Sequence, residues 1–368
     1  MTKLKTFIKN EIVLILSFVF AVISAFFVIP NEKYFEYIDF RTLGLLFCLM
    51  CVMAGFNKLG IFKFIAEKML SKVHSVSGLS LILGLLCFFT SMIITNDVAL
   101  ITFVPFTITA LRLSGKMNKL LWVVTIETVA ANLGSMLTPI GNPQNLYLFS
   151  AFNMGLGDFV STILPYAFLS FVLVAICCFF TGKGKIETQF NDNKNQFSKL
   201  HIVVYSLIFI VSLLTVFRVI PFEITVLITV ISVLMVDRKV LLKIDYSLLF
   251  TFVFLFIFIG NLGEIEPISD FLKSIVNGNE VLVGVASSQV FSNVPAAILL
   301  SKFTENAHDL LIGVNLGGLG TLIASMASLI SFKFVAKEKV NMGKYTLIFT
   351  VVNIMFLIFN LSLWLIIR

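Results

Sequence analysis

Charged residues are scarce in this sequence. Asp, Glu, Lys and Arg make up 13% of its 368 residues, whereas about a quarter is usual in a soluble domain. Hydrophobic residues make up 58%, and many apolar runs approach the roughly 20 residues that cross a bilayer core. This balance excludes an ordinary soluble domain and predicts an all-α, multi-pass protein of the cell membrane. The net charge of +7 then reflects basic loops on one side of the bilayer rather than binding to nucleic acid.

The residues that carry enzyme chemistry are also few. The three His stand in or beside expected loops, and all five Cys fall inside apolar runs, where neither disulfides nor metal clusters are expected. The sequence has no His-Glu-x-x-His, no Gly-x-Ser-x-Gly and no Gly-x-x-x-x-Gly-Lys-Ser/Thr. An ATP-driven pump would also need a nucleotide domain for which this chain has no room. We therefore expect neither an enzyme nor a bound cofactor.

A polar break inside an apolar run is present, and it occurs twice. The first is Thr95-Asn96-Asp97 and the second is Ser292-Asn293-Val294. Each is followed by a second signal, Asn132-Leu133-Gly134-x-x-x-Thr138 in the first half and Asn315-Leu316-Gly317-x-x-x-Thr321 in the second. Broken helices are tolerated in a bilayer only where they are buried in protein or line a watery cavity. Matching breaks in two repeats point to the binding site of a transporter.

The duplicated pattern predicts two repeats of inverted topology. Together they would contain about nine or ten transmembrane helices, two re-entrant helical hairpins and two interrupted helices. The first repeat covers 1–180, with a hairpin at 78–111 and a broken span at 120–153. A cytoplasmic linker covers 181–200, and the second repeat covers 201–368, with a hairpin at 281–303 and a broken span at 310–334.

The distribution of Lys and Arg predicts an orientation. With the amino terminus in the cytoplasm, the carboxyl terminus outside and both hairpins re-entrant, most of the 27 Lys and Arg residues fall in cytoplasmic loops. This bias follows the positive-inside rule. The first hairpin would then open from the cytoplasm and the second from outside. The basic residues left outside are Lys33, Arg41, Arg218, Lys273, Lys302 and Arg368.

Broken helices are suited to ion binding. The second piece of such a helix begins with unpaired N–H groups, which favour an anion, and the first piece ends with free carbonyls, which favour a cation. Neutral Asn, Ser and Thr side chains add hydrogen-bonding groups without the cost of burying a charge, although they also serve as caps and as hydrogen bonds between helices. The predicted substrate-binding residues are Thr95, Asn96, Asn132, Thr138, Asn142, Ser292, Asn293, Asn315, Thr321 and Ser325.

Two acids lie inside apolar runs, Asp97 and Glu127. A carboxyl within the membrane is costly and is by default a candidate for handling protons or cations. An alternative role for Asp97 is to cap the helix that begins at Val98, and an alternative for Glu127 is a bond to neighbouring backbone. The predicted coupling residues are Asp97, Glu127 and Asn145, and a sodium ion is expected near Asn96, Gly141 and Asn293.

Three stretches resemble the ion transporter superfamily. They are Asn96-Asp97-x-Ala99-Leu100-x-Thr102-x-x-Pro105, Ala131-Asn132-Leu133-Gly134-Ser135-x-x-Thr138-Pro139-Ile140-Gly141-Asn142-Pro143, and Ser292-Asn293-Val294-Pro295. That superfamily includes arsenite permeases, D-type sodium/proton antiporters and divalent-anion/sodium symporters with citrate-transporter-like domains. The resemblance covers nearly the whole chain. It implies a scaffold with a mobile transport domain, commonly dimeric, that moves in the manner of an elevator.

The tips of the two predicted hairpins differ from those of the dicarboxylate symporters. The paired Ser-Asn-Thr tips of those symporters correspond here to Thr95-Asn96-Asp97 and Ser292-Asn293-Val294. Asp97 resembles the arsenite and antiporter branches more closely. We predict a secondary transporter that moves a small inorganic or carboxylate anion with sodium or protons. The alternatives are a sodium/proton antiporter that uses Asp97 and Glu127, and an arsenite-type efflux permease. A channel would need a continuous polar pathway, which breaks entering from opposite sides do not provide.

Overall fold

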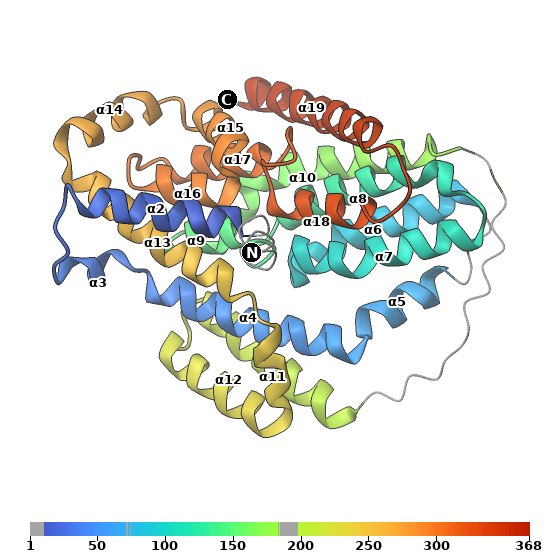
Figure 1. The fold of residues 1–368 in the computed structure, drawn as a ribbon, viewed down its shortest axis with the longest axis horizontal. Helices are drawn as coiled ribbons and strands as arrows, with labels where there is room; N and C mark the ends of the chain where they lie inside the picture. The colour runs from blue at the N-terminus through green and yellow to red at the C-terminus, as the bar shows by residue number, and fades with distance from the viewer. Residues whose placement is uncertain (1–10, 71–72, 74, 183, 185–197) are drawn as a thin grey trace, which may run out of the picture.

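Helices and the turns between them make up the described part of the chain, in which there is no β-strand (Figure 1). The computed structural model describes residues 11–70, 73, 75–182, 184 and 198–368. The predicted all-α class is therefore confirmed. The basic amino-terminal residues and most of the linker predicted at 181–200 lie outside the described residues.

The first half of the chain folds into helices whose ends follow local signals. They are α2 (Ile12–Ala25), α3 (Lys33–Tyr37), α4 (Phe40–Leu59), α5 (Ile61–Leu70), α6 (Val76–Ile94), α7 (Asn96–Leu113), the 3-10 helix η1 (Met117–Lys119), α8 (Leu120–Ser135), α9 (Pro143–Ala151) and α10 (Leu156–Phe179). Asp39 and Ser75 cap α4 and α6 by accepting backbone N–H bonds at 2.9 and 3.1 Å. Pro143 begins α9, where a residue without an N–H is well tolerated.

The second half repeats much of this order. Its helices are α11 (Lys199–Val216), α12 (Phe222–Asp237), the 3-10 helix η2 (Arg238–Lys243), α13 (Tyr246–Glu264), α14 (Glu266–Val276), α15 (Glu280–Phe291), α16 (Asn293–Ser301), α17 (Ala307–Gly317), α18 (Met326–Val335) and α19 (Met342–Ile367). Asp245, Asn306 and Asn341 cap α13, α17 and α19 with their side-chain oxygens.

Seven of the described helices are long and apolar enough to cross a membrane, namely α4, α6, α7, α10, α11, α13 and α19. The hairpin predicted at 281–303 corresponds to α15 and α16, whose 12 and 9 residues are too few for a crossing. The hairpin predicted at 78–111 corresponds to α6 and α7, whose 19 and 18 residues are enough for one. The arms of the first hairpin are therefore longer than a re-entrant segment requires.

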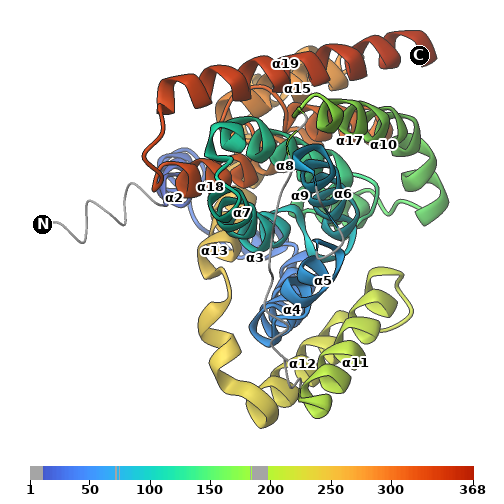
Figure 2. The ribbon, with the colours of Figure 1, turned by 90° about the vertical axis from the view of Figure 1, so that its right-hand side faces the viewer.

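Contacts between the halves run crosswise. The second piece of the first interrupted helix, α9, packs against α16, and the second piece of the other, α18, packs against α7. In Figure 1, α6, α7 and α8 lie on the right and α15, α16 and α17 on the left. A separate group contains α4 with α11 and α12, and α2 packs along α13. Figure 2 shows α11 and α12 at one end of the molecule and α19 at the other.

The Gly of each Asn-Leu-Gly sequence lies where two helices pack too closely for a Cβ atom. A Cβ on Gly134 would lie 2.1 Å from the carbonyl oxygen of Phe88, because α8 presses directly on α6. A Cβ on Gly317 would lie 2.4 Å from Ser288 Oγ, because α17 presses on α15 in the same way. In each half, the first piece of the interrupted helix is thus packed closely against the first arm of its hairpin.

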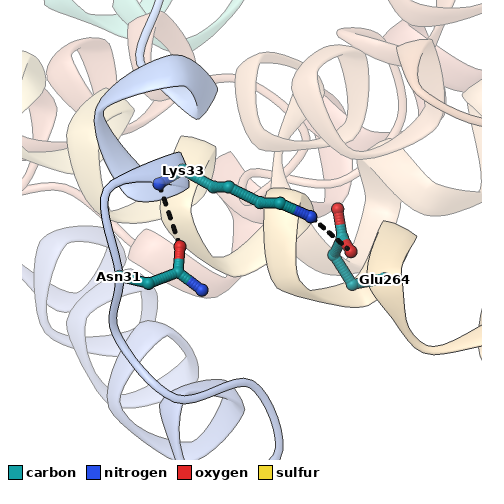
Figure 3. Close-up of polar contacts among 3 residues, drawn as sticks. All are labelled: Asn31, Lys33 and Glu264. Atoms are coloured by element: carbon teal, nitrogen blue, oxygen red, sulfur yellow. Dashed lines mark hydrogen bonds and ion pairs between the residues drawn. The ribbon is translucent and has the colours of Figure 1, made fainter.

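Polar contacts hold α3 and the end of α2 to α13. Lys33 Nζ lies 3.5 Å from Glu264 Oε2, while its backbone N–H donates to Asn31 Oδ1 at 2.9 Å (Figure 3). This ion pair is exposed and contributes at most about 1 kcal/mol. Asn261 contributes more to the position of these elements, because its buried amide donates to Ser24 Oγ and Tyr34 OH, both at 2.9 Å.

Candidate functional site

Two non-glycine residues with positive φ form the turns inside the hairpins. Thr95 joins α6 to α7 with φ 71° and ψ 151°, and Ser292 joins α15 to α16 with φ 75° and ψ 153°. Asn96 and Asn293 follow and begin the second arms. The Asn96 N–H donates to the Gly141 carbonyl at 3.2 Å, and the Asn293 N–H donates to the Ala324 carbonyl at 2.9 Å. Each turn is therefore attached to the non-helical segment of the interrupted helix in its own half.

The interrupted helices restart at matching residues. Asn142 precedes α9 and Ser325 precedes α18, and both have extended backbone torsions. Asn142 Oδ1 accepts the Asn145 N–H at 2.9 Å, as expected for an N-cap. When the two Asn-Leu-Gly signals are aligned, Asn142 corresponds to Ser325. Each of these two residues directly precedes the second piece of its interrupted helix.

The carbonyls at the ends of α8 and α17 are occupied by side-chain amides. Asn145 Nδ2 donates to the carbonyls of Met136 and Thr138, both at 3.1 Å. Gln289 Nε2 donates to the carbonyls of Gly317 and Leu319, both at 2.9 Å. These amides satisfy backbone groups that a broken helix would otherwise leave unpaired. The carbonyl ends are consequently less available to a cation than the sequence alone predicts.

The second arms of the two hairpins and the two restarted helices line a single small pocket. Each of four helices contributes its first residues, and α13 contributes one apolar side chain. The lining residues are Asn96 and Asp97 of α7, Pro143 and Gln144 of α9, Asn293 and Val294 of α16, Ser325, Met326 and Ala327 at the start of α18, and Leu248 of α13.

The electrostatics of this pocket are set by helix ends and one acid. Each of the four helices has nine or more residues and presents a partial charge of about +0.5 at its N-terminus. No Lys, Arg or His is among the lining residues. Asp97 is their one charged side chain, and its Oδ1 is buried without a hydrogen-bond partner in the described chain. The helix ends favour an anion, and the carboxylate requires a proton or a cation beside it.

A buried network links the halves behind the pocket. Asn132 Oδ1 accepts from Asn96 Nδ2 at 3.0 Å and from Ser325 Oγ at 3.1 Å. In the mirrored position, Asn315 Oδ1 accepts from Asn142 Nδ2 at 3.3 Å. The Asn of each Asn-Leu-Gly sequence therefore contacts the residue that caps the second helix piece of the other half. Such crosswise bonds fix the four helix N-termini relative to one another.

The predicted site residues fall into four groups by position. Asn96, Asp97, Asn293 and Ser325 line the pocket, whereas Asn132, Asn142, Asn315 and Ser292 are buried behind it. Asn145 and Gly141 bond to the protein itself, since Asn145 Oδ1 also accepts from Asn315 Nδ2 at 2.7 Å. The remaining residues lie elsewhere: Thr138 donates its hydroxyl to the Met92 carbonyl, Thr321 is exposed, and neither Thr95 nor Glu127 is a lining residue.

Most of the lining residues were not predicted, among them Gln144 and Leu248. Gln144 is buried, and its amide makes no hydrogen bond to any other described residue; the amide of Asn293 is equally unpartnered. The position of Gln144 directly after Asn142-Pro143, at a helix N-terminus, was the available signal. Leu248 belongs to α13, far from the repeated signals, and nothing in the sequence associates it with them.

Most of the chain is similar in sequence to known proteins. Residues 4–327 match the citrate transporter family. The chain is 37% identical to an uncharacterised transporter of Methanocaldococcus jannaschii over 334 residues. This aligned region covers 90% of this chain and 91% of that protein. It is 30% identical over 310 residues to the inner membrane protein YbiR of Escherichia coli, 82% of each chain. A putative arsB transporter of Dictyostelium discoideum is 26% identical over 171 residues, 46% of this chain and 30% of that protein.

Proposed function

The chain belongs to the citrate transporter family of the ion transporter superfamily and is a multi-pass membrane transporter, not an enzyme; on this premise, we propose that it moves a small anion by secondary active transport. The anion is an inorganic or carboxylate species, and sodium or protons supply the driving force. The protein works in the cell membrane with its amino terminus in the cytoplasm and its carboxyl terminus outside, as the distribution of basic residues favours.

One observation carries the proposal, namely the convergence of four helix N-termini on one pocket that contains a single carboxyl. Unpaired N–H groups at a helix start attract anions without any basic side chain. Asn293 and Gln144 add amides that make no bonds to the described protein, so they are free to donate to a bound oxyanion. Asn96 and Ser325, which also line the pocket, complete the proposed substrate-binding set.

Asp97 gives a physical reason for coupling. A bare anion beside an ionised, unpartnered carboxylate would be repelled by several kcal/mol at an effective dielectric constant of about 20. Asp245, the cap of α13, adds a second negative charge within electrostatic reach of Asp97. Binding of a sodium ion or a proton at Asp97 removes this repulsion, and the anion and its coupling ion therefore bind together.

Alternating access in this proposal uses the two inverted repeats. The crosswise packing of α9 on α16 and of α18 on α7 supports a unit that moves as one body. The group of α4, α11 and α12 supports a separate scaffold, which in a homodimer would carry the subunit contact. Movement of the unit past the scaffold would expose the pocket to each side of the membrane in turn.

Two alternatives keep specific support. The unpartnered Asp97 Oδ1 and the absence of basic lining residues in the described pocket favour a sodium/proton antiporter that uses Asp97 and Glu127. Similarity to the putative arsB transporter favours the arsenite-type efflux permease.

The test is a thermal-shift screen of the purified protein against citrate, other carboxylates, phosphate, sulfate and arsenite, each with and without sodium and at several pH values. A ligand that binds the native state raises the unfolding temperature. Anion-dependent stabilisation that grows with sodium or with acidity supports the proposal. Stabilisation by sodium alone, followed by sodium-driven collapse of a pH gradient in vesicles without any anion, would support the antiporter and overturn the anion transporter.

A further inference from the structure

A second carboxyl is buried away from the pocket, in the middle of α8. Glu127 is 0% exposed. Its Oε1 accepts a hydrogen bond from the Thr107 hydroxyl of α7, and its Oε2 is buried without a partner among the described residues. None of the ion pairs in the described chain involves it. An intramembrane carboxyl of this kind is expensive to keep ionised, and it marks a functional site by default.

The ionisable groups that face Glu127 come from three other helices and are all neutral in their ordinary state. They are Cys87 of α6, Cys178 of α10 and Tyr345 of α19, each within electrostatic reach of the carboxyl. All three side chains are buried. No cation among the described residues is therefore placed to compensate a negative charge on Glu127, and a bound proton is the group that does so.

A row of hydroxyls and amides between α8 and α18, which we call the α8–α18 seam, runs from Thr128, the residue after Glu127, to the pocket. Ser325, Ser328 and Ser331 recur every three residues on α18, and all are buried. Thr128 Oγ1 donates to Ser331 Oγ at 2.7 Å, and Asn132 Nδ2 donates to Ser328 Oγ at 3.4 Å. The seam ends at Asn132, which bonds to Asn96 and Ser325 at the pocket.

We propose that Glu127 is a proton-binding site distinct from the ion pocket, and that the α8–α18 seam links its protonation to the position of α18. This inference rests on the proposed function, since it assigns the proton to a residue outside the substrate site. The step is an acid dissociation: the carboxyl O–H bond breaks, the proton passes to water, and the carboxylate remains.

Loss of the proton would change the hydrogen bonding at the seam. An ionised Glu127 requires hydrogen-bond donors at both oxygens, but only Oε1 has one, the Thr107 hydroxyl, among the described residues. The hydroxyl of Thr128, the next residue of α8, now donates to Ser331 Oγ. Recruiting the Thr128 hydroxyl to the carboxylate would break that bond. Because the other end of α18 lines the pocket through Ser325, Met326 and Ala327, the change would reach the residues that meet the substrate.

The test is an infrared pH titration of the protein in lipid bilayers without any added anion. Wild-type protein is expected to show a protonated-carboxyl band that disappears as the buffer is taken from mildly acidic to alkaline. Glu127→Gln should lose this band. Glu280→Gln is the matched control, because Glu280 is also buried, accepts one hydroxyl bond, from Thr304 at 2.8 Å, and has an unpartnered Oε2, but lies outside the seam.

Further variants separate a proton site from a fixed structural acid. Glu127→Asp should shift the frequency of the band rather than remove it, which assigns the band even if Glu127→Gln folds poorly. Ser331→Ala should move the pH midpoint of the band, whereas Ser301→Ala, outside the seam, should not. Asp97→Asn serves as the background for these variants, because it removes the carboxyl of the pocket. In that background, a band that survives Glu127→Gln, or that persists at every pH when Glu127 is intact, would overturn the proposal. The titration uses no substrate, so it is readable even if no anion proves to be transported.

Discussion

Thr95 and Ser292 hold the same strained backbone conformation at equivalent turns, with φ of 71° and 75° and ψ of 151° and 153°. This region of torsion space is populated almost entirely by glycine, and a residue with a side chain costs about 1–3 kcal/mol there. The turns persist because the next N–H groups bond to Gly141 and Ala324. The strain places the first residue of each second arm at the pocket instead of continuing the first helix.

Replacing Thr95 with Gly should relieve this strain. We expect the free energy of unfolding to rise by about 1 kcal/mol, since the relief exceeds the glycine entropy cost of about 0.5–1 kcal/mol. Thr102→Gly, inside α7, is the control, because no strain exists there and the change should destabilise. Thermal unfolding in detergent measures both. Equal destabilisation by the two variants would contradict the assignment of strain to Thr95.

Asn293→Ala should abolish uptake while leaving the fold nearly unchanged. The amide of Asn293 bonds to no other described side chain or backbone group, so its loss removes a contact with the ligand rather than with the protein. Loss of a hydrogen bond to a charged ligand is expected to weaken binding about tenfold to a hundredfold. Asn360→Ala is the control, because Asn360 is buried and bonded to Ser170 at 3.2 Å, outside the pocket. Normal uptake by Asn293→Ala would remove this residue from the site.

Asp97→Asn should separate anion binding from the coupling ion. The amide keeps the shape of the carboxyl but carries no charge, so the electrostatic repulsion of an anion is gone. We expect the variant to be stabilised by the anion equally well with and without sodium, and across pH, whereas wild type requires one of them. Thermal shift measures this directly. A variant that keeps the full sodium or pH dependence of wild type would place the coupling ion elsewhere.

Gly141→Ala should damage the site through the backbone. A Cβ at this position would lie 2.1 Å from the Ser135 carbonyl oxygen, and the carbonyl of Gly141 is the acceptor for Asn96. We expect a loss of about 1–3 kcal/mol in stability from the overpacking, together with loss of uptake. Gly157→Ala is the control, because nothing lies within 4 Å of its Cβ position. Its stability should be unchanged or slightly raised, as for any alanine in an open helical position.

The repeated polar signals pointed to part of the candidate pocket, for a reason that particular residues make clear. Asn96 and Asn293 both line the pocket, and each begins a helix after a break. Helix starts can be recognised in a sequence from N-cap residues and prolines. Gln144 was missed because its counterpart, Ala327, is apolar, so comparison of the repeats gave no signal. The capping of α8 and α17 by Asn145 and Gln289 was equally hidden, since each amide reaches a carbonyl of another segment.

The sequence by itself determined the membrane class, the helices, the two breaks and the family, because hydrophobic run length, capping residues and backbone-breaking residues act locally. Only the tertiary structure decided which polar groups remain free. Hydrogen bonds between distant segments occupy the side chains of Asn132, Asn142, Asn145 and Asn315. Among the described residues, the side-chain amides of Asn293 and Gln144 and one oxygen each of Asp97 and Glu127 have no hydrogen-bond partner. Which of several chemically equivalent amides and carboxyls is left to bind an ion depends on distances between helices that no local pattern encodes.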